Sequence, residues 1–254
     1  TPIQKILIED GQAQGVQLVN NTVVKSDIVI SNADLTYAYR ELMDTQHRRR
    51  YSDQKIATLK QASSALLFYW GVDHELPDML HHNVYFSEDF KHNLEEIFHE
   101  RVLPKDPAFY VYIPTKTDPG LAPKGKNVMY ILVPVPNLKS DVDWDKAVTS
   151  TRKRVLERLK TIMHVDIKNH IETEAVFTPK DFLTKFNLTD GSAFGLSHYF
   201  FQSGYFRPHN VSREVKGLYF TGASTYPGSG VPMVTLSGKL VAERINHDYK
   251  HGTN

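Results

Sequence analysis

The chain has 254 residues, of which 41% are hydrophobic and 23% are charged, and its formal net charge is +1. This composition is typical of a globular protein with one large or two small domains, and the small net charge gives no reason to expect a nucleic-acid partner. Because the chain contains no cysteine, disulfides, thiolate metal sites and cysteine nucleophiles are excluded. No apolar run is long enough to span a bilayer, so any membrane contact is expected from the side.

The first part of the chain is predicted to form a small β unit. Residues 3–9 and 13–19 alternate in polarity around Asp10-Gly11, a strong hairpin signal. Residues 22–31 supply a third and a fourth strand, broken near Ser26-Asp27. The continuous apolar run 28–30 predicts a strand that is covered on both faces. A helix is expected over 35–42.

The middle of the chain mixes strands and helices. Strands are predicted over 63–72, 108–114, 127–136 and 170–179, and a long amphipathic helix over 144–165. A second helix is predicted over 87–100, with Ser87 as N-cap. Its apolar face would comprise Phe90, Leu94, Ile97 and Phe98.

The last part reads as strand, turn and helix, over 217–222, 222–230 and 231–249. The turn, here called the glycine corner, holds Gly222, Gly228 and Gly230. A glycine turn before a helix start forms a cradle for an anion or a cofactor, since free amides point outward there; the alternative is a tight turn without a ligand. Pro232 suits the first helical turn. The apolar face of the helix would comprise Met233, Leu236, Leu240, Val241 and Ile245.

Other features have two interpretations each. Glu96 and His99 are spaced i, i+3, and His92 lies one turn before Glu96, a histidine motif that can place metal ligands on one helix face. The alternative, which we expect for this motif and for His81-His82, is an exposed polar face. The aromatic run 194–206 is either core or the wall of an apolar cavity. Arg207 is either a ligand anchor or part of a structural ion pair. The basic run 47–50 is either a solvated helix end or a contact for phosphates or lipid headgroups.

The segment GLYFTGASTYPGSGVPMVTLSGKLVAERI, preceded by GSAFGLSHYFFQSGYFRPHN, resembles the C-terminal region of bacterial and fungal phytoene desaturases. Residues 105–136 resemble the middle of that family, and residues 13–34 are similar to the segment that re-enters its flavin domain. The N-terminal Gly-x-Gly-x-x-Gly motif of the family is absent. We therefore expect the chain to be the C-terminal part of a longer enzyme.

The resemblance implies an α/β fold and a set of site residues. Residues 1–35 and 205–254 would belong to a Rossmann-like flavin domain, and residues 36–204 to a substrate domain of sheet and helices. The implied contacts to FAD are Gly222, Ala223 and Ser224 at the ribityl chain and phosphate, and Gly230, Val231, Pro232 and Met233 at the isoalloxazine. Phe194, Phe200 and Arg207 are candidates for lining the substrate tunnel. No catalytic residue is assigned.

The implied reaction is FAD-dependent desaturation of phytoene, with hydride transfer from an isoprenoid C–H to the flavin. Alternatives of the same class are a carotenoid isomerase, a carotenoid oxygenase and a retinol saturase; a cofactor-free binding module is the alternative of another class. Because the substrate dissolves in lipid, we expect an intracellular protein attached peripherally to a membrane, with residues 152–160 as one candidate surface.

Overall fold

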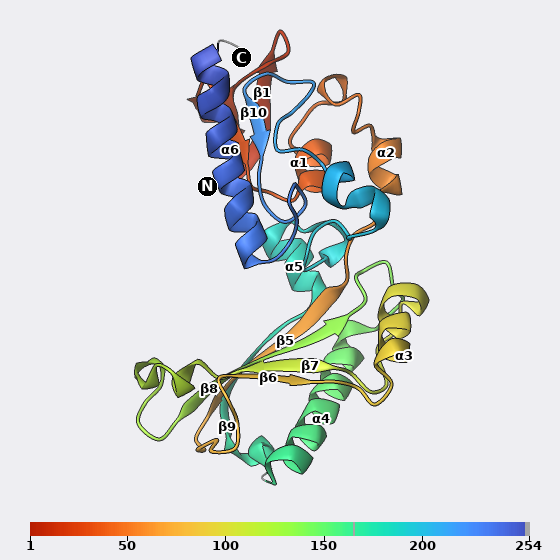
Figure 1. Ribbon diagram of the computed structural model, residues 1–254, viewed down its shortest axis with the longest axis vertical. Coiled ribbons are helices and arrows are strands. Elements are labelled where there is room, and N and C mark those ends of the chain that lie inside the picture. The colour runs from red at the N-terminus through yellow and green to blue at the C-terminus, as the bar shows by residue number, and fades with distance from the viewer. Residues whose placement is uncertain (165, 252–254) are drawn as a thin grey trace. The chain divides into compact units, whose positions relative to one another are not determined.

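The computed structural model describes residues 1–164 and 166–251, so Val165, the expected end of the long helix, lies outside the described residues. The chain divides into two compact units (Figure 1). Unit 1 comprises residues 1–62 and 187–189 and the described residues from Phe194 onward, and unit 2 comprises residues 63–186 and 190–193. The expected boundary at residue 35 therefore differs from the observed one: residues 36–62, 187–189 and 194–204 fold with the two terminal segments.

Unit 1 contains two small sheets and three α-helices. An antiparallel sheet has the order β1-β2-β3, and a parallel pair joins β10 to β4. The elements are β1 (Ile3–Glu9), β2 (Gln12–Leu18), β3 (Val23–Lys25), β4 (Val29–Ser31), α1 (Leu35–Glu41), α2 (Asp53–Thr58), β10 (Leu218–Phe220) and α6 (Val231–His251).

The predicted hairpin is confirmed, with Asp10 and Gly11 at positive φ between β1 and β2. The expectation that β4 is covered on both faces is wrong for Ile30, which is 52% exposed, whereas Val29 is buried. A three-residue strand alternates sides, so only one face of β4 reaches the core. That core gathers residues of β4, α1 and β10, including Leu35, Ala38 and Leu218.

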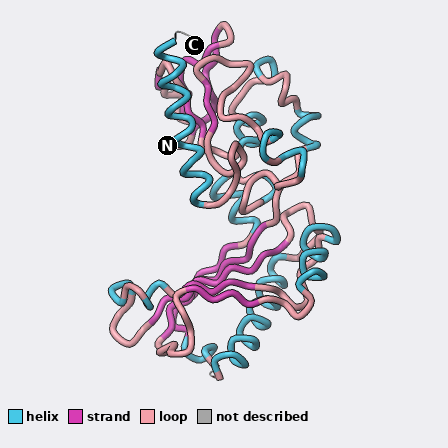
Figure 2. Tube along the Cα trace, viewed as in Figure 1, coloured by secondary structure: helices cyan, strands magenta, loops and turns pink. Residues whose placement is uncertain are grey.

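Unit 2 is a five-stranded antiparallel sheet in the order β6-β7-β8-β5-β9 (Figure 2, strands in magenta). Its strands are β5 (Ser64–Val72), β6 (His82–Tyr85), β7 (Phe109–Tyr112), β8 (Asn127–Val135) and β9 (Ile171–Phe177). Its helices are α3 (Phe90–Glu95), α4 (Trp144–Met163) and α5 (Pro179–Phe186), and α3 runs on into a π-helical turn, Glu96–Glu100.

Helix α4 covers one face of this sheet because its apolar residues recur at helical spacing. Val155 and Leu159 are fully buried and pack with Trp70 and Phe68 of β5. The alternating burial along β8 places Ile131 in the same core.

The predicted apolar face of the 87–100 helix is confirmed for Ile97, which is 3% exposed, and wrong for its other three residues. Phe90, Leu94 and Phe98 are about two-fifths exposed, whereas Asn93 and Glu96 are almost fully buried. The polar side faces inward because it binds a neighbouring loop: the Asn93 amide donates to the carbonyl of Asp106 at 3.2 Å, and the Glu96 carboxylate accepts from the amide of Lys105 at 3.4 Å. The N-cap is Asp89 rather than Ser87.

Within unit 1, helix α6 is joined to β10 through a buried carboxylate. Asp248 is 3% exposed and accepts from the Tyr219 hydroxyl of β10 at 3.0 Å and from Arg244 Nε at 3.0 Å. Burial by itself favours the neutral acid, but the bonds from Arg244, Tyr219 and His247 lower the pKa of Asp248 below its usual value. The folded state therefore stabilises the ionised carboxylate of Asp248.

Replacement of Asp248 with asparagine is expected to lower the free energy of unfolding at pH 7 by about 1–3 kcal/mol, because the charge-assisted bonds are lost. A depressed pKa stabilises the fold above the unfolded-state pKa and stops doing so as the pH falls through the folded-state value. The difference from the wild type should thus shrink below about pH 4. Thermal denaturation at pH 7 and pH 3 measures both effects. Glu243→Gln on the exposed side of α6 is the control, and an equal loss there would contradict the assignment.

Candidate functional site

Two parallel strands of unit 1 end at the same edge of their sheet. Strands β4 and β10 pair from Val29 opposite Leu218 to Ser31 opposite Phe220. The chain continues from β4 into residues 32–34 and from β10 into the glycine corner. In α/β sheets, ligands bind outside the carboxyl ends of parallel strands. The glycine corner therefore lies at the edge where a cofactor site is expected.

All three glycines of the corner have a positive φ that other residues rarely adopt, and two of them, Gly222 and Gly230, differ in the space around the missing Cβ. Gly222 has φ +108°, and a Cβ there would lie 2.7 Å from Oδ1 of Asn32, which follows β4. Gly230 has φ +101°, but a Cβ there would meet no atom within 4 Å. The first glycine is thus required for packing of the two strand ends. The second leaves open space next to bare main chain.

Helix α6 begins beside that open space. Val231 is 79% exposed and Met233 is 41% exposed, and Pro232 between them has no amide hydrogen. Within the part of the chain that the structure describes, no hydrogen bond is recorded from the amides of Val231 and Met233. First-turn amides lack intrahelical acceptors and carry the positive end of the helix dipole. Free donors between exposed apolar side chains fit the polar edge of a planar, mainly apolar ring such as isoalloxazine.

The side chain of Ser224 is directed inward instead. Its hydroxyl donates to Oδ2 of Asp34 at 3.1 Å and accepts from the amide of Leu196 at 3.2 Å. The carbonyl of Ala223 accepts from Arg207. Any contact of Ser224 with a cofactor would therefore be made by main-chain atoms. Sequence reasoning did not single out Asp34, although an aspartate before a helix is a capping signal.

Arg207 is 1% exposed and forms no ion pair among the described residues. The alternative of a structural ion pair is therefore wrong. Its donors bind main-chain carbonyls, among them those of Leu196 and Gln202 at 3.0 Å and Thr225 at 3.1 Å. Burial lowers the pKa of Arg207 to about 10, so the side chain is still a cation at neutral pH. Arg207 lies within the fold, between the aromatic run and the glycine corner.

The aromatic run is exposed rather than buried. Phe200 and Phe201 are each 75% exposed and lie 5.2 Å apart between ring centroids. The Phe206 ring lies 5.8 Å from Phe200 in a tilted arrangement and 5.6 Å from Phe201 edge to face. Tyr205 is 81% exposed, and Phe194 is 36% exposed. The core interpretation is wrong for these side chains. We name Phe200, Phe201, Tyr205 and Phe206 the aromatic cluster.

A second aromatic surface lies in unit 2, on the sheet face opposite α4. Tyr69 of β5 lies 5.1 Å from Tyr130 of β8 and 6.0 Å from Phe177 of β9, and Tyr110 of β7 lies 6.3 Å from Tyr130. These half-buried rings cross four strands, and we name them the aromatic row. Burial raises the pKa of Tyr130 to about 12, so its hydroxyl stays neutral. Sequence reasoning missed this row because its members lie far apart along the chain.

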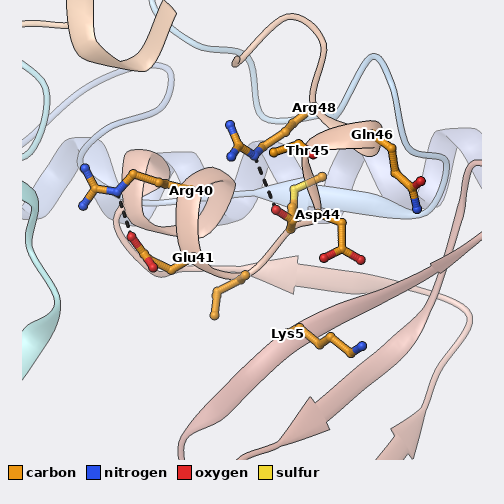
Figure 3. Close-up of a pocket in the computed structure, with 9 residues that line it drawn as sticks. Lys5, Arg40, Glu41, Asp44, Thr45, Gln46 and Arg48 are labelled. Atoms are coloured by element: carbon orange, nitrogen blue, oxygen red, sulfur yellow. Dashed lines mark hydrogen bonds and ion pairs between the residues drawn. The ribbon is translucent and has the colours of Figure 1, made fainter. Parts of the chain in front are cut away.

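The basic run contributes to a polar cleft of about 490 Å³ in unit 1 (Figure 3). Lys5 of β1, residues 40–46 and Arg48 line it, and Arg40 pairs with Glu41 at 2.8 Å. Arg48 is 4% exposed; it contacts the carbonyl of Met43 and pairs with Asp53 at 2.8 Å. Arg48 is therefore structural, whereas Arg49 and Arg50 are exposed.

The histidine motif forms no larger cluster. His92 Nε2 lies 3.7 Å from the carboxylate of Glu96, and His81 and His82 contact each other and tyrosines of β7. Among residues 1–164 and 166–251, no three His, Asp or Glu side chains are arranged to hold a metal ion. No helix in those ranges is both long enough and apolar enough to cross a membrane.

Comparison with known proteins shows which family the chain belongs to. Residues 1–246 match the family described as flavin containing amine oxidoreductase. The chain belongs to that family. A crystal structure of an oxidoreductase from Methanosarcina mazei is similar in fold, with a TM-score of 0.63 and 20% identity over 95% of this chain and 48% of that one. A protein from Pyrococcus furiosus gives a TM-score of 0.56 at 13% identity.

Curated relatives of this flavoprotein are more similar in sequence. A zeta-carotene-forming phytoene desaturase from Myxococcus xanthus is 43% identical over 96% of this chain and 47% of its own length. A 4,4'-diapophytoene desaturase from Staphylococcus haemolyticus is 41% identical over 98% of this chain and 51% of its own. The predicted resemblance, the α/β class and the flavin are confirmed. The chain spans about half the length of the curated relatives it matches.

Proposed function

We propose that this chain forms part of an FAD-dependent desaturase that dehydrogenates phytoene in carotenoid biosynthesis. The observation that carries the proposal is identity above 40% with carotenoid desaturases along almost the whole chain. The open glycine corner adds support, because it presents bare main chain at the residues for which the resemblance implies flavin contacts. The FAD would accept a hydride from the substrate.

In this proposal, unit 1 holds the cofactor. Gly230, Val231, Pro232 and Met233 would contact the isoalloxazine, and the main chain of residues 222–224 would contact the ribityl chain and phosphate. The exposed apolar side chains of the helix start would exclude water from the ring. Fixed amides at a helix start interact favourably with developing negative charge without reorganising.

The substrate would lie on apolar surface. Phe194 and the aromatic cluster, which includes Phe200, offer exposed rings in unit 1, and the aromatic row offers a similar surface in unit 2. Phytoene has about forty carbon atoms, and removing each CH₂ from water gains about 0.8 kcal/mol. A substrate that starts in lipid gains almost none of this, because its transfer is from one hydrocarbon environment to another. Binding would therefore depend on shape and on direct transfer from a membrane.

We also propose that the protein is peripherally attached to a membrane, inside the cell. The aromatic cluster supports this, since exposed phenylalanine and tyrosine side chains partition into the bilayer interface. Residues 152–160 are less suitable than expected, because Val155, Leu156 and Leu159 are buried. Flotation with liposomes tests attachment, and a full-length protein that stays entirely at the bottom of the gradient would refute it.

Product analysis tests the activity. The full-length protein should convert phytoene into more unsaturated carotenoids in a phytoene-accumulating host, and a parallel host that accumulates 4,4'-diapophytoene tests chain-length preference. An isomerised, oxygenated or retinoid product would favour a related enzyme. A colourless purified protein that takes up no FAD would favour a binding module and would overturn the proposal.

A further inference from the structure

Two buried charged side chains form hydrogen bonds with residues of the glycine corner. Asp34 is 7% exposed and Arg207 is 1% exposed. Neither forms an ion pair within the described ranges, although burying a charge without an opposite partner is costly unless hydrogen bonds compensate. Both charges are compensated by groups of the corner itself and of the segments that lead to it.

The carboxylate of Asp34 connects the two strand ends. Its Oδ1 accepts from the amide of Tyr37 at 3.1 Å and from the hydroxyl of Thr189 at 2.6 Å, and Thr36 also donates to it. Its Oδ2 accepts from Ser224 in the corner at 3.1 Å. One carboxylate therefore caps α1, which follows β4, and holds a hydroxyl of the segment that follows β10.

The guanidinium of Arg207 holds the same segment by its carbonyls. Nε donates to the carbonyl of Thr225 at 3.1 Å, and Nη2 donates to those of Leu196 at 3.0 Å and Ala223. Nη1 donates to the carbonyl of Gln202 at 3.0 Å. The planar fork thus bridges the aromatic run and the glycine corner, which a lysine ammonium cannot do equally well.

These two sets of bonds share residues. Leu196 gives its amide to the Ser224 hydroxyl and its carbonyl to Arg207, so a continuous network runs from the anion to the cation. The carbonyl and the amide hydrogen of a trans peptide point in opposite directions. With the Ala223 carbonyl on Arg207, the amide of Ser224 is directed away from the guanidinium. The network therefore fixes the direction of a main-chain donor in the corner.

We propose that Asp34 and Arg207 are a coupled pair of positioning residues that hold residues 222–225 in the conformation that receives the cofactor. Neither side chain contacts the ligand in this proposal. The identity of the ligand as a flavin rests on the proposed function. The coupling between the two buried charges does not, because it follows from the hydrogen-bond network of the free chain.

A double-mutant cycle in the full-length protein tests the pair. The variants are Asp34→Asn, Arg207→Gln and the double variant, with Arg207→Lys as the conservative change. Arg213→Gln is the matched control, since Arg213 is an exposed arginine of the same unit whose guanidinium bonds His209 at 2.7 Å, outside the network. Three readouts are used: hydrogen exchange of peptides covering 222–230 in flavin-free protein, FAD affinity by fluorescence quenching, and the visible spectrum of bound flavin.

Each single variant should speed exchange in the corner at least about threefold and weaken FAD binding about tenfold, with shifted flavin bands. Arg207→Lys should recover part of the loss. The double variant should lose less than the product of the two single losses, because the residues share one network. Arg213→Gln should match the wild type.

Wild-type exchange in Arg207→Gln, or losses that multiply without coupling, would overturn the inference. If Arg207→Gln does not fold, Asp34→Asn and Arg207→Lys decide it, since the first keeps the size and shape of the side chain and the second keeps its positive charge. Failure of the wild type to bind FAD would remove the proposed function, whereas the exchange measurement in flavin-free protein would still decide the positioning role.

Discussion

Gly230→Ala is expected to weaken FAD binding by the full-length protein by about tenfold or more, which corresponds to about 1.4 kcal/mol. Gly230 has φ +101° and open space around its missing Cβ. The new methyl group would therefore enter the volume in which we place the flavin, without a clash inside the protein. Equilibrium titration of FAD into apoprotein measures the change.

Gly11→Ala is the matched control for this prediction. Gly11 also has positive φ, +76°, with no atom within 4 Å of its Cβ position, and it lies in the β1–β2 hairpin of the same unit. Both substitutions introduce similar backbone strain, about 1–2 kcal/mol, so both should lower the melting temperature by similar amounts. Only Gly230→Ala should reduce affinity for FAD. Unchanged affinity in that variant would place the flavin away from the start of α6.

Trp70→Ala is expected to lower the stability of unit 2 by about 3–5 kcal/mol, the range for loss of a large buried aromatic. Trp70 is 1% exposed, and its Nε1 donates to the Glu174 carboxylate of β9 at 2.8 Å. Arg152 of α4 lies over the ring, 5.7 Å from its centroid. The ring therefore contacts its own strand, the neighbouring strand β9 and helix α4. Its removal leaves a cavity and takes one donor from the Glu174 carboxylate, which keeps its bonds from Arg152.

Circular dichroism should show the melting transition of Trp70→Ala lowered by roughly 10 °C or more. The neighbouring Tyr69→Ala provides the comparison, because Tyr69 points to the other face of β5 and is 38% exposed. Loss of the Tyr69 ring should lower the melting temperature clearly less than loss of Trp70. Equal losses at positions 69 and 70 would show that α4 does not provide the main core of the unit.

The elements with local signals could be predicted from the sequence. The β1–β2 hairpin follows from Asp10-Gly11, which adopts positive φ cheaply, and α4 follows from apolar residues at helical spacing. The strand, turn and helix around the glycine corner were predicted for the same reason. Each of these signals depends on residues close together in the chain.

The orientation of α3 shows that a local sequence pattern does not predict which side of a helix is buried. Its apolar residues have a regular helical spacing, yet Asn93 and Glu96 lie inward because residues 105 and 106 supply partners for their polar groups. A helical pattern states which residues share a face and leaves open which face is covered. That choice depends on a loop that only the tertiary structure brings near.

By itself, the sequence determined the family, the flavin and the glycine corner as the place to look for the flavin site. Motif residues and the backbone freedom of glycine can be recognised from residues that are close together in the chain. Only the tertiary structure decided that Ser224 points inward, that Arg207 binds carbonyls rather than a carboxylate, and that Asp34 belongs to the same network. Partners of a buried charge come from segments more than a hundred residues apart, such as Thr189 and Asp34, and no spacing along the chain encodes their approach.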